Sequence, residues 1–393
     1  MTKLHGRRHQ RLALFVLIAA SFALAACGTD LAGGNWPGVS AHDGVVYVAY
    51  GPQVLAVTVG EETPLWTFPT TDSAAAPIFA PPSVEDGRIV FGDYGTQGGF
   101  LSPSTEVTIY SLQVSEEGVP AVRWAESAVA QDKIVAPALQ AGDRVFVGTG
   151  DNHVLALDAA SGDLLWDFET GHSVWGQPIY QDGVVYVTSL DKQVHALDAA
   201  DGREIWNQQL GGAVSDRAAL NSGLVYVGAF DGTLYALDRD SGEVQWTAEA
   251  ERSIWAAPVY SDGTVFFVDA GGELRAVSAA SGELRWSKSL GNFVVATPLV
   301  LGDTLFVATS GDPDVEEEAR EGQLFAFDTG DGEDKWPEPV TAAAPISTNP
   351  IEVSGGVLIT TLTEDEPLTL RLYDPEDGSL LWDFEPPSSA EQG

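Results

Sequence analysis

The sequence predicts an all-β fold, an eight-bladed β-propeller of four-stranded antiparallel blades. Three observations predict it: a pattern that repeats about every 40 residues, a tryptophan at the same place in each repeat, and turn-forming residues roughly every 8 to 12 positions. The composition agrees, because 42 glycines, 22 prolines and 11 tryptophans in 393 residues favour a large β core with many tight turns.

The repeat is clearest in the middle of the chain. One pattern occurs there four times, as VLALDAASGDLLW (154–166), VHALDAADGREIW (194–206), LYALDRDSGEVQW (234–246) and LRAVSAASGELRW (274–286). A period of this size is typical of repeat architectures, in which one unit cannot bury both of its faces alone. A closed ring of stacked sheets is the usual solution for β units.

Each unit contains the signals of an antiparallel meander. The run Leu234–Asp238 alternates β-favouring residues and predicts a strand with two different faces. Asp238 then opens a tight turn by accepting backbone N–H groups, and Gly242 is expected to close that turn with a positive φ. The run Val225–Gly228, bounded by turn residues on both sides, predicts an earlier strand of the same unit.

The same spacing extends the count to eight units. A turn-opening residue lies eight positions before most of the tryptophans, and only the unit from Gln113 to Trp124 has a longer turn. We expect these tryptophans to pack between blades as structural docking residues, and they are Trp66, Trp124, Trp166, Trp206, Trp246, Trp286, Trp336 and Trp382. Seven blades remain the alternative if the first or second unit is misassigned.

The N-terminal segment indicates export and attachment to a lipid. Basic residues between Lys3 and Arg11 precede a short apolar run, and Leu24-Ala25-Ala26-Cys27 resembles a bacterial lipobox, in which the cysteine is acylated and becomes the first mature residue. An ordinary signal peptide with an incidental cysteine is the alternative. The predicted organisation is a lipoprotein signal peptide over 1–26, a lipid-anchored tether over 27–35, one propeller domain over 36–386 and a disordered tail over 387–393.

Charge and cysteine content exclude several classes of function. A formal net charge of −38 argues against nucleic acid as a partner and against docking of the domain on an anionic membrane. A single cysteine, Cys27, excludes an intramolecular disulfide and a cysteine-based zinc site. The sequence contains no nucleophile elbow and no Walker loop, and no Ser-His-Asp arrangement can be proposed from it. We therefore assign no catalytic residue, and expect His195 to be a packing or rim residue.

Two units carry insertions. The stretch 95–106 in the second unit is rich in Gly and Ser and predicts a loop. The stretch 311–322 in the seventh unit contains Asp312, Asp314 and Glu316, oxygen donors of the type that calcium prefers. Their spacing matches no EF-hand loop, and a solvated loop tip is the alternative, so that no metal is assigned.

Unusual side chains stand at the start of the first strand of several units. Alignment on Pro137, Pro178, Ala218, Pro258 and Pro298 places Ile134, Trp175, Ser215, Trp255 and Val295 in one column. The first strand of a propeller blade is the innermost, so Trp175 and Trp255 are expected at the mouth of the central channel, flanking a ligand or a partner's side chain. Asp216 and Arg217 stand where neighbouring units have small or uncharged residues. The alternative is that all four fill the funnel wall.

The consensus VYVGxxDGxLYALDxxxGxxxW, clearest at 225–246, resembles the pyrroloquinoline-quinone (PQQ)-like β-propeller repeat and extends over nearly all of residues 37–385. The resemblance implies the fold and the tryptophan docking. It also implies two kinds of function, that of quinoprotein dehydrogenases and that of non-catalytic propellers such as the lipoprotein subunit of the bacterial outer-membrane β-barrel assembly complex. Quinoprotein alcohol dehydrogenases typically carry a vicinal disulfide over the cofactor, whereas Cys27 here has no neighbour.

The predicted function is therefore that of a non-catalytic, exported lipoprotein on the periplasmic or extracellular face of a membrane. It would act as a protein-interaction scaffold for envelope protein partners, without a cofactor, without nucleic acid, and as a monomer on its own. Two alternatives stay open: a PQQ-dependent dehydrogenase of alcohols or sugars, which would bind PQQ with calcium, and a propeller that senses an envelope ligand.

Overall fold

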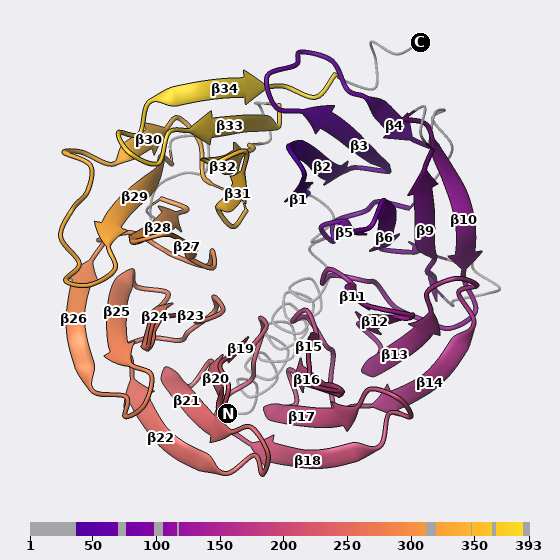
Figure 1. Cartoon of the computed structure of the whole chain (residues 1–393), viewed down its shortest axis with the longest axis horizontal. Helices are drawn as coiled ribbons and strands as arrows, with labels where there is room; N and C mark the ends of the chain where they lie inside the picture. Colours follow the sequence, from indigo (N-terminus) through magenta and orange to yellow (C-terminus); the bar gives the residue numbers. More distant parts are fainter. Residues whose placement is uncertain are drawn as a thin grey trace, which may run out of the picture. The chain divides into compact units, whose positions relative to one another are not determined.

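The computed structural model describes residues 37–69, 76–97, 105–115, 118–311, 320–346, 348–363 and 367–387. Regular structure in these residues is entirely β-strand, and eight four-stranded antiparallel sheets follow one another around an axis (Figure 1). The predicted eight-bladed propeller is thus confirmed, and the seven-bladed alternative is wrong. The expected signal peptide, the tether with Cys27, residues 388–393 of the expected tail, and Asp312, Asp314 and Glu316 lie outside the described residues.

The first four blades each begin at the centre of the ring and end at its circumference. Blade 1 contains β1 (Gly38–His42), β2 (Val45–Tyr50), β3 (Gln53–Thr58) and β4 (Trp66–Phe68). Blade 2 contains β5 (Ser83–Glu85), β6 (Arg88–Gly92), β9 (Ile109–Val114) and β10 (Pro120–Glu126). Blade 3 contains β11 (Leu139–Ala141), β12 (Arg144–Gly148), β13 (His153–Asp158) and β14 (Leu164–Glu169). Blade 4 contains β15 (Ile179–Gln181), β16 (Val184–Thr188), β17 (Gln193–Asp198) and β18 (Glu204–Gln209).

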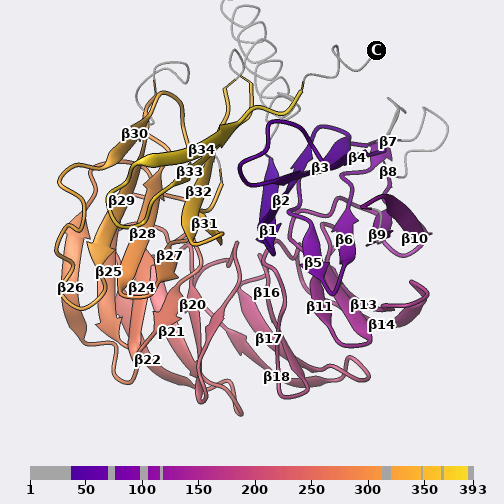
Figure 2. The same ribbon diagram turned by 45° about the horizontal axis from the view of Figure 1, so that its top comes forward.

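The other four blades repeat this order, and in the tilted view their strands stand side by side around the ring (Figure 2). Blade 5 contains β19 (Ala219–Leu220), β20 (Leu224–Gly228), β21 (Thr233–Asp238) and β22 (Val244–Glu249). Blade 6 contains β23 (Val259–Ser261), β24 (Thr264–Val268), β25 (Glu273–Ser278) and β26 (Leu284–Ser289). Blade 7 contains β27 (Leu299–Leu301), β28 (Thr304–Thr309), β29 (Gly322–Asp328) and β30 (Val340–Ala342). Blade 8 contains β31 (Ile351–Val353), β32 (Gly356–Thr361), β33 (Thr369–Tyr373) and β34 (Leu380–Phe384).

Two blades depart from the simple repeat. In blade 2, β7 (Thr96–Gln97) pairs with β8 (Thr105–Glu106) as a short antiparallel ribbon. The loop expected over 95–106 is therefore wrong at its two ends, because the backbone groups of these two short strands pair with one another. In blade 7 the docking residue Trp336 precedes β30 instead of lying in it. Pro337 and Pro339 follow this tryptophan, and proline cannot donate to a strand ladder.

The hydrophobic core lies between the blades rather than within any one of them. One cluster joins Phe146 and Ala156 of blade 3 to Val185, Val187 and Leu197 of blade 4. Equivalent clusters join other neighbouring pairs, and the aliphatic and aromatic side chains of the second and third strands are almost fully buried. Each blade therefore obtains its buried surface from its neighbours, as the repeat pattern predicts.

At seven of the eight junctions a tryptophan of one blade bonds to the turn of the next one. Across 2.9 to 3.2 Å, the indole Nε1–H donates to a turn carbonyl of the following blade in the pairs Trp124–Ala159, Trp166–Ala199, Trp206–Arg239, Trp246–Ala279, Trp286–Thr329, Trp336–Pro375 and Trp382–Glu61. Trp66 instead packs on the hydrophobic cluster that joins Tyr47 of blade 1 to Ile89 and Phe91 of blade 2. We infer that these contacts dock the blades.

The turn that receives the indole has a fixed chemistry. In blade 5 the Asp238 carboxylate accepts the backbone N–H groups of Asp240 and Ser241, at 3.1 and 2.9 Å. Gly242 has the positive φ that the sequence predicts, at 75°. A Cβ added to Gly242 would lie 2.5 Å from Cε3 of Trp206, so the turn glycine also leaves room for the indole.

The ring closes without an exchange of strands between its two ends. Blade 1 is built entirely from β1 to β4, and blade 8 entirely from β31 to β34. The junction consists of the Trp382–Glu61 hydrogen bond and a cluster in which Val48 and Leu55 of blade 1 pack with Leu358 and Leu370 of blade 8. Closure thus uses the same kind of contact as the other junctions.

Replacement of Gly242 by alanine tests the docking contact. We expect the free energy of unfolding to fall by about 3 kcal/mol, because a methyl group there adds a collision with Trp206 to the strain of a positive φ. Gly183 is the matched control, since its φ is 85° but no atom lies within 4 Å of its added Cβ. Gly183→Ala should lose only about 1 kcal/mol in the same urea titration. Equal losses in the two variants would contradict docking at Gly242.

Candidate functional site at the axis of the ring

The structure places Trp175, Ser215, Trp255 and Val295 at equivalent positions, each four residues before the first strand of blades 4 to 7. The assignment of Ile134 to this column is wrong by one residue, because β11 begins at Leu139 and Val135 takes the place instead. Ile134 is 1% exposed and packs on Gly92, as Val174 packs on Gly148. The alignment on Pro137 caused the shift, since proline fits two successive positions of an extended segment.

Trp175 and Trp255 are exposed aromatic residues next to the innermost strands. Trp175 lies between β14 and β15, and Trp255 between β22 and β23, with exposed fractions of 36% and 41%. The Trp255 ring packs against Phe230, with 4.6 Å between the centroids and 33° between the planes. Phe230 belongs to blade 5, so this contact fixes an exposed indole of blade 6 against its neighbour.

Asp216 connects four blades through its own polar atoms. Its backbone carbonyl accepts the Thr188 hydroxyl of blade 4 at 2.8 Å. Its carboxylate Oδ2 accepts the backbone N–H of Ala257 in blade 6 at 3.0 Å and the hydroxyl of Thr297 in blade 7 at 2.7 Å. The backbone N–H of Thr297 in turn donates to Asn349 of the segment leading into blade 8, at 2.8 Å. This arrangement holds the inner strands of blades 4 to 8 in one relative position.

Arg217 follows Asp216 and is exposed. Its backbone N–H donates to Asp216 Oδ1 at 2.7 Å, so both carboxylate oxygens of Asp216 accept hydrogen bonds. Within the residues that the structure describes, the Arg217 guanidinium makes no hydrogen bond or ion pair. We call Trp175, Ser215, Asp216, Arg217 and Trp255 the axial site, since the segments that carry them lie next to one another, with Gly176 against Asp216 and the Ser215 hydroxyl on the Trp255 carbonyl. It joins two aromatic surfaces, a free cation and a fixed carboxylate.

The sequence reasoning missed a buried charged cluster in blade 4. His195 is 4% exposed, and its Nδ1 lies 2.8 Å from Glu204 Oε1 while its Nε2 lies 3.2 Å from Asp191 Oδ2. Asp191 also accepts the backbone N–H of Gly171, which belongs to the loop that carries Trp175. His195 is thus buried, as a packing residue would be, but the expectation did not include its two acidic partners. The i, i+4 spacing of Asp191 and His195 in the sequence could have indicated the first of these pairs.

The cluster favours a charged imidazole. Burial lowers the pKa of His195, but its hydrogen bonds to Asp191 and Glu204 outweigh burial, so the pKa is raised above its ordinary value. Burial likewise raises the pKa of Asp191, yet the hydrogen bonds from His195 and the Gly171 N–H lower it overall. Both ring nitrogens then donate, and the imidazolium is paired on two sides.

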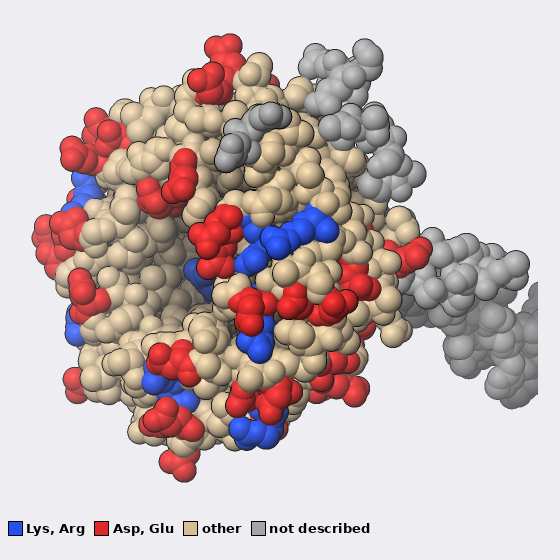
Figure 3. All heavy atoms as spheres, turned by 45° about the vertical axis from the view of Figure 1, so that its right-hand side comes forward, with Lys and Arg blue, Asp and Glu red and all other residues tan. Residues whose placement is uncertain are grey.

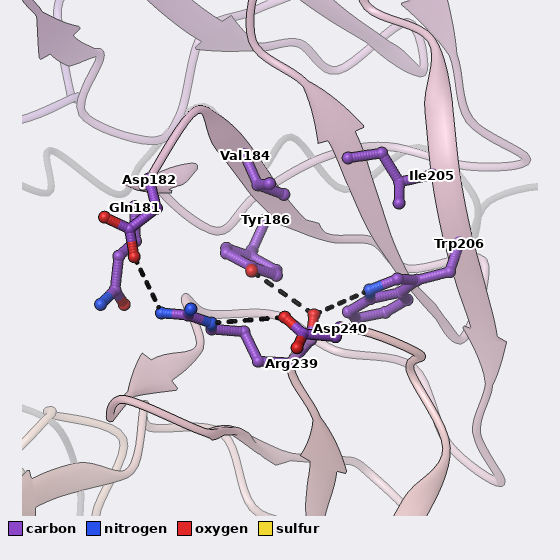
Figure 4. Close-up of a pocket in the computed structure, with 8 residues that line it drawn as sticks. All are labelled: Gln181, Asp182, Val184, Tyr186, Ile205, Trp206, Arg239 and Asp240. Atoms are coloured by element: carbon purple, nitrogen blue, oxygen red, sulfur yellow. Dashed lines mark hydrogen bonds and ion pairs between the residues drawn. The ribbon is translucent and has the colours of Figure 1, made fainter.

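A hollow lies at the junction of blades 4 and 5, beside the docking contact between Trp206 and Arg239 (Figure 4). Its volume is about 160 Å³, and Trp206, Tyr186 and Arg239 line it. The Arg239 guanidinium donates to Asp182 at 3.1 Å across the hollow. Between blades 3 and 4, Ala199 takes the place of Arg239, and the hollow lined by Ala199 and Tyr180 has a volume of about 560 Å³. These hollows follow from the docking geometry.

The surface of the ring is acidic and carries few cations, and it is hollowed at the centre (Figure 3). Among the residues that the structure describes, no three His, Cys, Asp or Glu side chains are grouped so that they could hold a metal ion. The described part of the chain also contains no helix long and apolar enough to cross a membrane.

A ring of eight four-stranded blades, in which seven tryptophans donate to a turn of the next blade, defines a PQQ-like β-propeller. The match to a family model gives the narrower assignment. The model of the family described as outer membrane protein assembly factor BamB matches residues 135–253 and 230–393, more than half of the chain, and the chain belongs to this family. The resemblance that the repeat indicates is thereby confirmed.

The similar proteins include both a BamB and dehydrogenases. The crystal structure of BamB from Moraxella catarrhalis superposes with a TM-score of 0.62 at 18% identity, covering 87% of this chain and 94% of that one. A europium-containing methanol dehydrogenase gives 0.64 at 13% identity, covering 80% and 78%. A quinoprotein ethanol dehydrogenase of Pseudomonas aeruginosa is 49% identical over 49 residues, which are 12% of this chain and only 8% of that protein. The structural likenesses establish the fold alone.

The raised pKa of His195 predicts a pH-dependent contribution to stability. A folded pKa above the unfolded value of 6.5 means that the contribution is complete below about pH 6.5 and is lost as the pH rises through the folded pKa. We expect His195→Gln to lower the free energy of unfolding by about 3 kcal/mol at pH 6 and by clearly less at pH 9. Urea titrations of both proteins over this range measure the difference. A loss that does not change with pH would show that His195 is not charged in the folded protein.

Proposed function

We propose that this protein is an exported, lipid-anchored propeller that acts as a protein-interaction scaffold in the cell envelope. The observation that carries the proposal is the match of the BamB family model to residues 135–253 and 230–393. The sequence match to a dehydrogenase, by contrast, includes 12% of this chain and 8% of that protein. A role in barrel assembly applies only in a cell that has an outer membrane.

The proposed organisation follows the expectation from the sequence. Residues 1–26 direct export, Cys27 carries the lipid, residues 27–35 form the tether, residues 36–386 form one propeller domain, and residues 387–393 form a tail. The ring needs no chemistry to act as a scaffold, because a rigid framework can present fixed side chains to a partner. The axial site, held by the ties of Asp216, is the surface that we assign to this task.

Substitution of the lipidated residue tests the anchor. Cys27→Ser removes the thiol that would carry the lipid, so we expect the protein to leave the membrane fraction and appear in the soluble extracytoplasmic fraction. Fractionation followed by mass spectrometry of the N-terminal peptide measures both the location and the acyl group. If the wild-type peptide carries no acyl mass, residue 27 is an incidental cysteine after an ordinary signal peptide.

Crosslinking in intact envelopes tests the scaffold role. The full chain should recover a defined envelope protein, and an axial-site double variant, Trp175→Ala with Trp255→Ala, should recover at least about tenfold less of it. Ile205→Ala is the control, because Ile205 is an exposed apolar residue of blade 4 outside the axial site, with an exposed fraction of 42%. Recovery of no envelope protein by the wild-type chain would contradict the proposal.

A PQQ-dependent dehydrogenase of alcohols or sugars is the second candidate, favoured by the local identity to the quinoprotein ethanol dehydrogenase. The fit of such a cofactor is partial. Exposed indoles and Arg217 suit a flat, carboxylated ring, but the described residues offer no group of three ligands for its calcium ion. They thus provide only part of a PQQ site, and no reaction step follows from them. Saturable quenching of tryptophan fluorescence by micromolar PQQ, dependent on calcium, would support this candidate over the scaffold.

A further inference from the structure

We propose that the axial site binds a peptide segment of the partner in which a carboxylate lies beside an aromatic or proline side chain. This inference rests on the proposed scaffold function and specifies the chemistry of the partner. It combines three observations: a guanidinium without a partner among the described residues, exposed indoles at the equivalent positions of the two neighbouring blades, and hydrogen bonds that tie Asp216, next to Arg217, to three other blades.

Arg217 supplies the charge. Some arginines of the propeller have acidic partners, such as Arg144 with Asp143 at 2.8 Å and Arg239 with Asp182 at 3.1 Å, and others, such as Arg371, donate to uncharged oxygens. Arg217 has no such partner among the described residues, although its neighbour Asp216 is a carboxylate. Both oxygens of Asp216 accept hydrogen bonds, from Arg217 N–H, Ala257 N–H and the Thr297 hydroxyl, and the carboxylate makes no ion pair with the Arg217 guanidinium. In a chain with a net charge of −38, a free guanidinium next to the axis is suited to a carboxylate from outside.

The two exposed tryptophans belong to the blades on either side of the blade that carries Arg217. Blade 5 has the small residue Ser215 where blades 4 and 6 have Trp175 and Trp255. The contacts place all three segments together, because a Cβ added to Gly176 would lie 2.7 Å from the carbonyl oxygen of Asp216. On the other side, the Ser215 hydroxyl donates to the Trp255 carbonyl at 3.0 Å. A flat side chain between exposed indoles gains aromatic contact and loses water.

The network around Asp216 prepares the site for binding. Thr188, Ala257 and Thr297 fix Asp216 from three different blades, and Phe230 supports the Trp255 ring. A backbone segment and an indole held in this way lose little conformational entropy on binding, so a short segment can bind with useful affinity. A loop or terminus of a partner protein can enter the axis of a ring, whereas a flat protein surface contacts only the rim. This argument favours a peptide segment over a broad interface.

The test is a selection of peptides on the full chain, purified in detergent. A random peptide library is selected on the wild-type protein, and the affinity of the most enriched peptide is measured by fluorescence anisotropy. We expect the enriched sequences to share Asp or Glu beside an aromatic residue or proline. Arg217→Gln should weaken binding about tenfold, Arg217→Lys less, and Trp175→Ala or Trp255→Ala about tenfold each. Arg203→Gln, an exposed arginine outside the axial site, is the control and should bind as the wild type does.

Several outcomes would overturn the inference. They are the absence of enriched peptides, enrichment of basic peptides, and equal binding by Arg217→Gln when its thermal unfolding matches that of the wild type. Citrate and PQQ are the comparison ligands, since either could use the same guanidinium, and tighter binding of either than of any peptide would also overturn it. The scaffold proposal is separable: an envelope partner whose recovery is unaffected by Arg217→Gln would leave the scaffold standing and move its binding surface elsewhere.

Discussion

The structure depends on the contact between a tryptophan of one blade and the aspartate–glycine turn of the next. The indole N–H satisfies a turn carbonyl, and the glycine provides the space in which the ring lies, as Trp206 and Gly242 show. Because the hydrophobic clusters also lie between blades, no sheet is complete without its neighbours. A fixed angle at each junction then decides how many blades a closed ring contains.

The contacts between blades near the axis of the ring differ from those at its circumference. At the circumference seven of the eight junctions repeat the same hydrogen bond, which explains why the repeat is visible in the sequence. Near the axis the ties are individual, with Asp216 bound to Thr188, Ala257 and Thr297 in three other blades. Side chains that depart from the repeat collect there, and in a repeat protein such departures are where specificity can arise without disturbing the fold.

The repeat explains what could be predicted from the sequence. Blade number, the positive φ of Gly242 and the eight docking tryptophans follow from local spacing, and the structure bears out the first two. Ile134 was assigned one position away from its true place in the aligned column because the alignment relied on Pro137, whereas packing against Gly92 determines where Ile134 lies. The His195 cluster and the Asp216 ties join residues that no repeat brings into register, and the Asp216–Thr297 pair is separated by 81 positions. The axial site was predicted as a set of unusual residues, but its geometry required the structure.

The closure of the ring without strand exchange has a consequence for how the protein folds. Seven junctions join blades that are adjacent along the chain, but the eighth brings Trp382 to Glu61 across 321 positions. Forming a contact at this distance carries the largest loop-closure entropy in the molecule, and no shared strand compensates for it. We therefore expect blades to assemble progressively into an open arc, with the junction of blades 8 and 1 forming last. The same junction should then be the first to separate when the ring unfolds.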